Sequence, residues 1–414
     1  MTNKEAAIKI IRRLRSNGFE ALLAGGCVRD MLLRRTASDY DVTTNAHPED
    51  VMKIFKRTLK VGAKFGVVIV LIEDKKVEVA TFRTETGYAD GRHPAAVKFA
   101  GAAEDASRRD FTINGMFYDP LKKEVIDYVN GRADLKKELI RTIGRPAKRF
   151  GEDYLRMLRA VRFSTQLGFA IEPRTFSAIC SNSKHIAKIS GERIAMELEA
   201  ILISPSRSTG VSLLVKSGLA EAIFPDFPAK DTSAVRRPRA EFGIKVLAQL
   251  RKKSNFALSM AALFAGCSTE LAMEKCKVLK LSRSQTKHIK FLLDGRGELL
   301  DEKMSLAQLK LIVSEPYFED LYELQRAIQR AERRSIAALV NLRKRIKALG
   351  DVELRPKPLL NGHALIRLGA VQGPDVGHLA EEMYIAQLEG KLQGKEQAEQ
   401  WVQNWLKKHK TIEK

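Results

Sequence analysis

Cysteine is scarce in this sequence, and its few copies lack the spacing of a metal site or a disulfide scaffold. Cys27, Cys180, Cys267 and Cys276 include no C-x-x-C pair and have no histidines at zinc-binding spacing. We therefore expect neither a zinc site nor a fold held together by disulfides. Unpaired cysteines are instead typical of a reducing compartment.

Long apolar runs are absent as well. No stretch approaches the ~20 residues that a membrane-spanning helix needs, so no membrane partner is expected. The first residues place Ile8, Ile11 and Leu14 at helical spacing ahead of Gly18, which predicts an amphipathic helix rather than the apolar core of a signal peptide. These absences together predict a cytoplasmic protein.

Acidic residues are outnumbered by basic ones. The 414 residues include 72 Lys and Arg against 50 Asp and Glu, which gives a net charge of +22. Such an excess predicts a polyanionic partner. The alternative, a basic surface that serves only solubility, would give the same composition. The length suits two to four domains with ample core, and no oligomeric state follows from the sequence.

Two carboxylates one residue apart are the most informative feature that is present. Along a β-strand, residues i and i+2 point to the same face, so Asp39 and Asp41 are expected to meet the same metal ions. Two Mg²⁺ ions about 4 Å apart would suit nucleotidyl transfer. Taken alone, a D-x-D pair is more often a solvated edge strand or a turn.

A glycine turn lies just ahead of these carboxylates. Residues 21–24 read as a short strand, Gly25 and Gly26 as a turn and residues 28–33 as a short helix, with Arg29 in its first turn. Glycines let the backbone approach a phosphate closely, and an arginine there adds charge. The glycines and Arg29 therefore predict a triphosphate site.

The run LLAGGCVRDMLLRRTASDYDVTT at residues 22–44 resembles the head motif of the class II tRNA nucleotidyltransferases and bacterial poly(A) polymerases. Similar motifs follow in the order of that family: EVATFR (78–83), RRDFTINGM (108–116), GRADL (131–135) and EDYLRMLRAVRF (152–163). The resemblance is dense over residues 20–200, thins beyond them, and returns near residue 361. It implies an enzyme that transfers nucleotides to RNA, with Mg²⁺ as cofactor.

The resemblance also suggests roles for single residues in the head. Glu78 would be a third carboxylate beside Asp39 and Asp41, or else a structural residue paired with Arg83. Asp110 would accept a hydrogen bond from the ribose 2′-hydroxyl. Arg109 and Asn114 would support Asp110.

A carboxylate and a guanidinium three residues apart are expected to read the base. Asp153 and Arg156 would share one face of a helix, where they offer an acceptor beside a donor. Cytosine and adenine match this pair, whereas uracil and guanine invert it, so the pair predicts CTP and ATP as substrates. Arg159 and Arg162 would brace this template or meet phosphates. Outside this motif, the same spacing would mean a surface salt bridge.

Residues 88–99 (YADGRHPAAVKF) resemble the flexible loop of family members that add A after two Cs, and Asp90 and Arg92 would move with it. The expected function is therefore addition of C, C and A to tRNA. An A-adding enzyme or a poly(A) polymerase remains the alternative within the family, and a non-catalytic RNA-binding protein remains the alternative outside it.

The expected fold class is α+β, with a small mixed-sheet nucleotidyltransferase head followed by an all-α neck, body and tail. The boundaries are placed at 1–139, 140–204, 205–295 and 296–414. The helical half would contact the tRNA backbone rather than its bases. The basic residues proposed for this role are Arg236, Arg237, Arg251, Lys252, Lys253, Arg343, Lys344 and Arg345.

Overall fold

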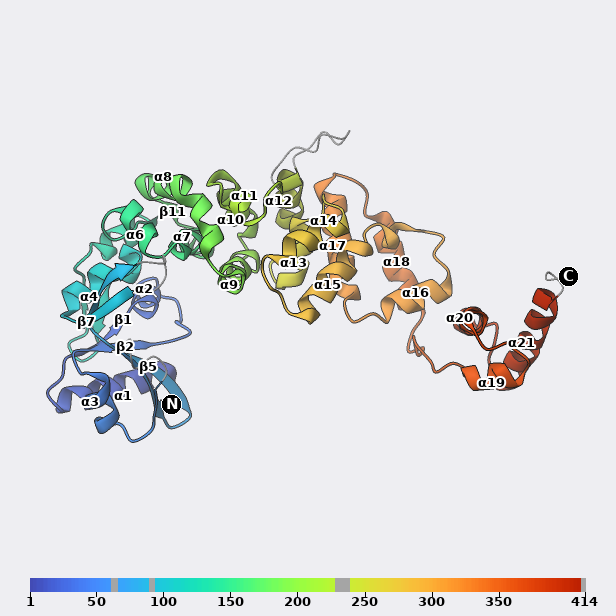
Figure 1. The fold of residues 1–414 in the computed structure, drawn as a ribbon, viewed down its shortest axis with the longest axis horizontal. Helices are drawn as coiled ribbons and strands as arrows, with labels where there is room; N and C mark the ends of the chain where they lie inside the picture. Colours follow the sequence, from blue (N-terminus) through green and yellow to red (C-terminus); the bar gives the residue numbers. More distant parts are fainter. Residues whose placement is uncertain (61–65, 89–93, 228–238, 411–414) are drawn as a thin grey trace. The chain divides into compact units, whose positions relative to one another are not determined.

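The computed structural model describes residues 1–60, 66–88, 94–227 and 239–410, and Figure 1 labels its elements. The chain forms two compact units. The first comprises Met1–Ile244, Lys252–Phe256 and Glu270–Ser282, and the second comprises Lys245–Arg251, Ala257–Thr269 and Arg283–Lys414. A mixed sheet at the start of the chain is followed by helices, so the predicted α+β class is confirmed. The four-part division at 139, 204 and 295 stays a prediction.

A mixed sheet of seven strands begins the first unit, in the order β3-β4-β5-β2-β1-β8-β9. Only β2 and β5 run parallel among these neighbours. The strands are β1 (Ala21–Ala24), β2 (Asp41–Thr44), β3 (Thr58–Leu59), β4 (Val67–Ile72), β5 (Lys75–Thr81), β8 (Phe117–Asp119) and β9 (Glu124–Ile126). A separate hairpin pairs β6 (Arg83–Tyr88) with β7 (Pro94–Phe99), and a short parallel pair joins β10 (Leu139–Ile140) to β11 (Ala170–Ile171).

The register of the central strands brings the glycine turn to the carboxylates. Ala24, the last residue of β1, pairs with Asp41, the first residue of β2. The turn that follows β1 therefore begins beside Asp41. On the other side of β2, Val42 pairs with Val79 of β5, which places Glu78 next to the start of β2. The strand order thus gathers motifs that are dozens of residues apart in the sequence.

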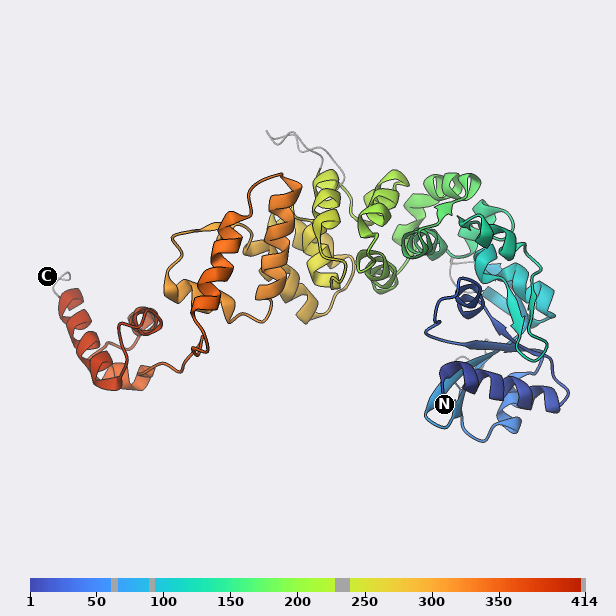
Figure 2. The ribbon, with the colours of Figure 1, turned by 180° about the vertical axis from the view of Figure 1, so that it is seen from behind.

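Helices support this sheet because their apolar residues recur on one face. In α1 (Asn3–Ser16), Thr2 and Glu5 form a capping box, and Ile10, Ile11 and Leu14 are buried. This helix packs on β1 and β5, and it lies beside α3 in both ribbon views (Figures 1 and 2). The other helical elements of this region are α2 (Gly26–Leu32), α3 (Pro48–Ile54), α4 (Ala102–Arg108), α5 (Gly131–Lys136) and the 3₁₀ turn Thr112–Asn114.

The rest of the first unit is built around α7 (Leu155–Leu167), which packs against α9 and α10. Its neighbours are α6 (Pro146–Glu152), α8 (Pro173–Asn182), the 3₁₀ helix Ser183–Lys188, α9 (Gly191–Leu202), α10 (Arg207–Lys216) and α11 (Leu219–Ile223). Helices α12 (Arg239–Gln249) and α14 (Thr269–Lys277) carry residues of both units.

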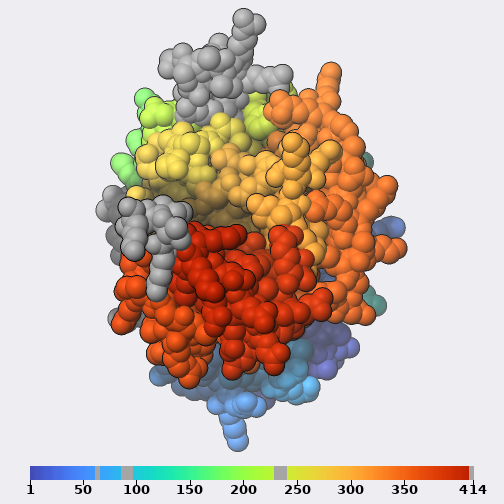
Figure 3. Space-filling model, turned by 90° about the vertical axis from the view of Figure 1, so that its right-hand side faces the viewer, coloured from blue at the N-terminus to red at the C-terminus, as the bar shows by residue number. Residues whose placement is uncertain are grey.

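All regular elements among the described residues of the second unit are helices. Its elements are α13 (Phe256–Leu263), α15 (Arg283–Asp294), the 3₁₀ turn Glu298–Leu300, α16 (Leu306–Val313), α17 (Phe318–Ala331), α18 (Ala337–Ala348), α19 (Gly362–Arg367), α20 (Pro374–Leu388) and α21 (Lys395–Lys410). Asn361 caps α19, and the last three helices share a core of their own that includes Leu365, Leu379 and Val402. Their side chains form the red surface in Figure 3. Among the described residues, no helix combines the length and the apolar character required to cross a bilayer.

Candidate active site

A polar cavity of about 420 Å³ opens in the first unit where the sheet meets α7. Its lining comprises Gly25, Gly26, Arg29, Asp41, Arg108, Arg109, Asp110, Asn114, Asp153, Arg156, Arg159 and Phe163. All but Arg108 and Phe163 are residues that the sequence singled out for a site. The structure therefore brings together the predicted phosphate, ribose and base residues from three separate motifs.

The glycine turn forms one wall of the cavity. Gly25 has a φ of +75°, and a Cβ atom there would lie 3.1 Å from Nη1 of Arg109. A side chain at this position would therefore strain the backbone and crowd the arginine. Glycine keeps the backbone open to a ligand at the place where β1 ends and α2 begins.

Two of the cavity's arginines are held in place by carboxylates. Arg29 donates to Asp30 through Nε and Nη2 (2.8 and 3.0 Å), and through Nη1 to Oδ1 of Asn114 (2.8 Å). Arg109 donates to Asp105 through Nε and Nη2 (3.1 and 2.9 Å). Asp105 is fully buried, and its carboxylate also pairs with Arg108 at 2.7 Å. The protein itself thus holds both guanidinium groups in fixed orientations.

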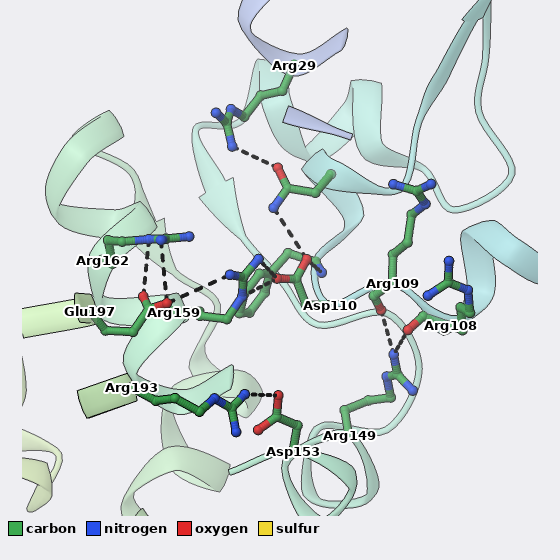
Figure 4. A network of polar contacts seen from close by, with 12 residues as sticks. Arg29, Arg108, Arg109, Asp110, Arg149, Asp153, Arg159, Arg162, Arg193 and Glu197 are labelled. Carbon is green, nitrogen blue, oxygen red and sulfur yellow. Dashed lines mark hydrogen bonds and ion pairs between the residues drawn. The ribbon is translucent and has the colours of Figure 1, made fainter. Parts of the chain in front are cut away.

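Asp110 is the centre of a hydrogen-bond network that crosses the cavity (Figure 4). Its Oδ1 accepts from the backbone N–H of Phe111 (2.8 Å) and from Asn114 (3.3 Å), and its Oδ2 accepts from Nε of Arg159 (2.8 Å). Burial by itself would raise the pKa of Asp110, but the ion pair and hydrogen bond with Arg159 outweigh it and lower the pKa to about 2. Asp110 is therefore an ionised acceptor at neutral pH.

The two residues expected to read the base do not share a helix, and that expectation is wrong. Asp153 has an extended backbone (φ −147°, ψ 107°) between α6 and α7, whereas Arg156 lies in the first turn of α7. Oδ1 of Asp153 accepts from the N–H of Leu155, the first residue of α7, at 3.0 Å. Both side chains nevertheless line the same cavity.

Helix α9 supplies two cavity supports that sequence reasoning missed. Arg193 donates through Nη2 to Oδ2 of Asp153 at 3.2 Å. Glu197 pairs with Arg162 (3.2 Å) and approaches Arg159 (3.8 Å), as Figure 4 shows. Arg162 does not line the cavity. It contributes to the site only indirectly, through its ion pair with Glu197. In the sequence, Arg193 and Glu197 look like an ordinary i,i+4 surface pair, and only their distant partners reveal the role.

The three carboxylates that were expected beside a metal are arranged differently from the prediction. Strand β2 begins at Asp41, so Asp39 lies two residues ahead of it, where its Oδ2 accepts from the Ser38 hydroxyl (2.9 Å). The expected strand alternation of the two aspartates is therefore wrong. Glu78 is exposed on β5 and makes no ion pair within the described residues, so the alternative pair with Arg83 is not found there.

The electrostatics of Asp41 fit a cation. This residue is exposed to the cavity, yet its pKa is raised to about 6, chiefly because surrounding atoms displace its water and then because of the negative charge of Glu78, with Asp39 adding to the effect. Arg109 opposes the shift. A divalent cation would relieve this repulsion. No group of three or more His, Cys, Asp or Glu side chains in the described part of the chain is arranged to hold a metal ion, so phosphate oxygens and water would have to supply most of the coordination.

Several predicted contacts lie elsewhere. Asp90 and Arg92 of the loop, like Arg236 and Arg237, fall outside the described residues. Arg343 is already engaged, since it pairs with both carboxylate oxygens of Glu319 and lies 4.0 Å from the ring centroid of Tyr322. Tertiary partners therefore make Arg343 a poorer candidate for an RNA contact than its exposed neighbour Lys344.

Comparison with known proteins places this cavity in a family. Residues 21–141 match the family model described as "Poly A polymerase head domain", and residues 168–230 match "Probable RNA and SrmB- binding site of polymerase A". A CCA-adding enzyme of Lactobacillus johnsonii is 34% identical over 397 residues, which cover 93% of each chain. The chain belongs to the family of CCA-adding enzymes.

Other members of the family agree with this assignment. A CCA-adding enzyme of Geobacillus stearothermophilus is 44% identical over 228 residues, covering 55% of this chain and 56% of the relative. The crystal structure of the Bacillus stearothermophilus CCA-adding enzyme in complex with CTP superposes with a TM-score of 0.81 at 29% identity, and the match covers 100% of both chains. The resemblance drawn from the sequence motifs is thus confirmed.

Proposed function

We propose that this chain adds C, C and A to the 3′ ends of tRNA, taking CTP and ATP and releasing pyrophosphate. The observation that carries the proposal is the cavity, where a glycine turn, Asp41, Asp110 and the Asp153–Arg156 pair line one space. Membership of the CCA-adding family along nearly the whole chain supports the same reaction. The net charge of +22 suits a tRNA partner.

The arginines would bind the triphosphate and Asp110 would bind the ribose. Arg29 and Arg109 are fixed by Asp30 and Asp105, so little side-chain entropy is lost when they meet phosphate oxygens. Asp110 is ionised and lines the cavity, so it could accept a hydrogen bond from the ribose 2′-hydroxyl in place of its longest existing contact, the one from Asn114 at 3.3 Å. These side chains would thereby hold the triphosphate and the ribose of the nucleotide before reaction.

Base selection would follow from an acceptor beside a donor. Asp153 accepts from an exocyclic amine, and Arg156 donates to the neighbouring ring nitrogen. Cytosine and adenine present this pattern, whereas uracil and guanine present its reverse and would leave buried groups unpaired. Such a mismatch discriminates by roughly 10⁴-fold. Protein side chains would therefore act as the template for CTP and ATP.

Asp39 and Asp41, with Glu78 beside them, would hold Mg²⁺. When bound, Mg²⁺ would lower the pKa of the RNA 3′-hydroxyl and stabilise charge on the leaving pyrophosphate. The carboxylates are hard oxygen ligands, which suit this ion. The cytoplasmic location inferred from the sequence stays a prediction.

The decisive test is extension of two tRNA transcripts, one ending at the discriminator base and one ending in CC. Each is offered CTP alone, ATP alone, both, or UTP with GTP. We expect C, C and then A on the first transcript, A on the second, and no product with UTP and GTP. Addition of A to the second transcript alone would identify an A-adding enzyme, long A tails would identify a poly(A) polymerase, and binding without extension would identify a non-catalytic protein.

Removal of divalent cations is expected to stop extension and leave the fold intact. Excess EDTA should reduce the rate of C addition to background, because the carboxylates alone cannot stabilise the developing negative charge. Adding Mg²⁺ beyond the chelator should restore the rate, and circular dichroism should show unchanged helix content throughout. An unchanged rate of addition in EDTA would overturn the metal assignment while leaving the base assignment untouched.

A further inference from the structure

The two base-reading side chains are each engaged by a different partner. Arg156 donates through Nη1 to Oε2 of Glu152 (2.7 Å) and to the carbonyl oxygen of Arg149 (2.9 Å). Asp153 accepts from Arg193 instead. Without these partners, the opposite charges of Asp153 and Arg156, which line the same cavity, would be free to pair with each other. If Asp153 and Arg156 paired with each other, they would use the hydrogen-bonding groups that are needed to read a base.

We propose that Arg193 is a positioning residue that keeps Asp153 away from Arg156 and so sets the choice of base. This inference rests on the proposed function and adds a residue to its specificity mechanism. Oδ1 of Asp153 is already held by the N–H of Leu155, so Arg193 fixes the second oxygen and with it the plane of the carboxylate. The orientation of the carboxylate, and of the acceptor sites left on it, is then fixed.

The surroundings of Arg193 suit such a role. Its side chain is 24% exposed and that of Asp153 is 20% exposed, so solvent screens this ion pair only in part. Nη1 of Arg193 is buried and makes no hydrogen bond within the described residues. A buried Nη1 donor without a hydrogen-bond partner among the described residues is costly to stability, which indicates that the position of Arg193 serves something other than folding.

The helix that carries Arg193 is firmly placed. Gly191, two residues earlier, packs so closely that a Cβ atom would lie 1.9 Å from the carbonyl oxygen of Val278. Ile194 and Leu198 are buried on the same helix, and α9 packs along α7. Arg193 therefore extends from a well-packed helix. Its hydrogen bond to Asp153 restrains the extended segment that contains this residue.

The test compares the discrimination ratio, (kcat/KM for CTP)/(kcat/KM for UTP), in wild type and in Arg193→Ala. The same measurement is made for ATP against GTP on a transcript ending in CC. We expect the ratio to fall by about 10- to 100-fold, mainly through slower addition of the correct nucleotide, because Asp153 is then free to close on Arg156. Arg193→Lys should restore most of the ratio, since an ammonium also holds the carboxylate.

Controls separate positioning from general stability. Arg174→Ala, at an exposed arginine of α8, should leave the ratio unchanged. In an Asp153→Ala background, Arg193→Ala should have no further effect on the ratio, because the group that it positions is gone. A merely structural role would lower the rates with all nucleotides equally and leave the ratio at its wild-type value, and that result would overturn the proposal.

Two further outcomes are distinguishable. If Arg193→Ala does not fold, Arg193→Gln carries the same test, because glutamine preserves most of the packing but lacks the charge. If wild type adds no C and no A, the proposed function fails. If wild type adds them correctly and the Arg193 variants discriminate as well as wild type, only the inference about Arg193 fails.

Discussion

Asp41→Asn is expected to reduce the rate of nucleotide addition by at least about 10³-fold, because asparagine is neutral and binds Mg²⁺ poorly. Asp41 is the carboxylate that lines the cavity directly, where β2 begins beside the glycine turn. The measurement is single-turnover addition of C to a tRNA transcript at saturating CTP. It isolates the chemical step from product release.

The same variant should not lose stability in EDTA. The pKa of Asp41 is raised to about 6 by lost hydration and by Glu78, so near pH 7.5 the ionised carboxylate is less favourable in the folded chain than in the unfolded one. Removing that charge is expected to leave the unfolding temperature unchanged or raise it. Asp74→Asn, in an exposed turn where Asp74 pairs with Lys75, is the matched control and should keep wild-type activity. A wild-type rate in Asp41→Asn would contradict the assignment of the metal site.

Asp110→Ala is expected to cost both stability and sugar selectivity. Its carboxylate joins Asn114, Arg159 and the Phe111 N–H, and removing one partner of a buried ion pair costs about 3 kcal/mol. Urea unfolding at pH 7 measures this loss. In extension assays, the preference for CTP over dCTP should fall by roughly 10-fold or more, because the acceptor for the 2′-hydroxyl is gone.

The pH dependence of that stability difference follows from the lowered pKa of Asp110. Its folded-state pKa of about 2 lies below the ordinary value of 3.8, so the ion pair stabilises the fold above about pH 4 and ceases to do so as the pH falls through about 2. The gap between wild type and variant should therefore narrow in acid. Asp50→Ala, which removes an exposed pair with Lys53, should change stability by less than about 0.5 kcal/mol. An equally small change in Asp110→Ala would refute the role of this network.

Local sequence patterns predicted the head of the protein well. The strand predicted at residues 21–24 forms at those residues, and the short helix predicted at residues 28–33 forms at Gly26–Leu32. Gly25, Arg29 and Asp110 line the expected cavity because each belongs to a motif with a short, fixed geometry. Roles that depend on a bound nucleotide or metal stay predictions.

Predictions that relied on continuing a regular element were wrong. Asp39 was expected on the strand with Asp41, but pairing with β1 extends only from Ala21 to Ala24, so β2 starts at Asp41. Asp153 and Arg156 were expected on one helix, but α6 ends at Glu152, Asp153 is extended, and α7 begins only at Leu155. In both cases the regular element is interrupted, and periodicity alone does not contain that information.

The sequence by itself determined the family, the order of the motifs, the basic charge and most residues of the cavity, because these depend on residue type and short spacing. Only the tertiary structure decided which side chains support them. Arg29 meets Asn114 across 85 residues, and Arg193 meets Asp153 across 40. The strand register and the packing of α9 on α7 create these contacts. Their partners are far apart along the chain, so no local pattern in the sequence marks them.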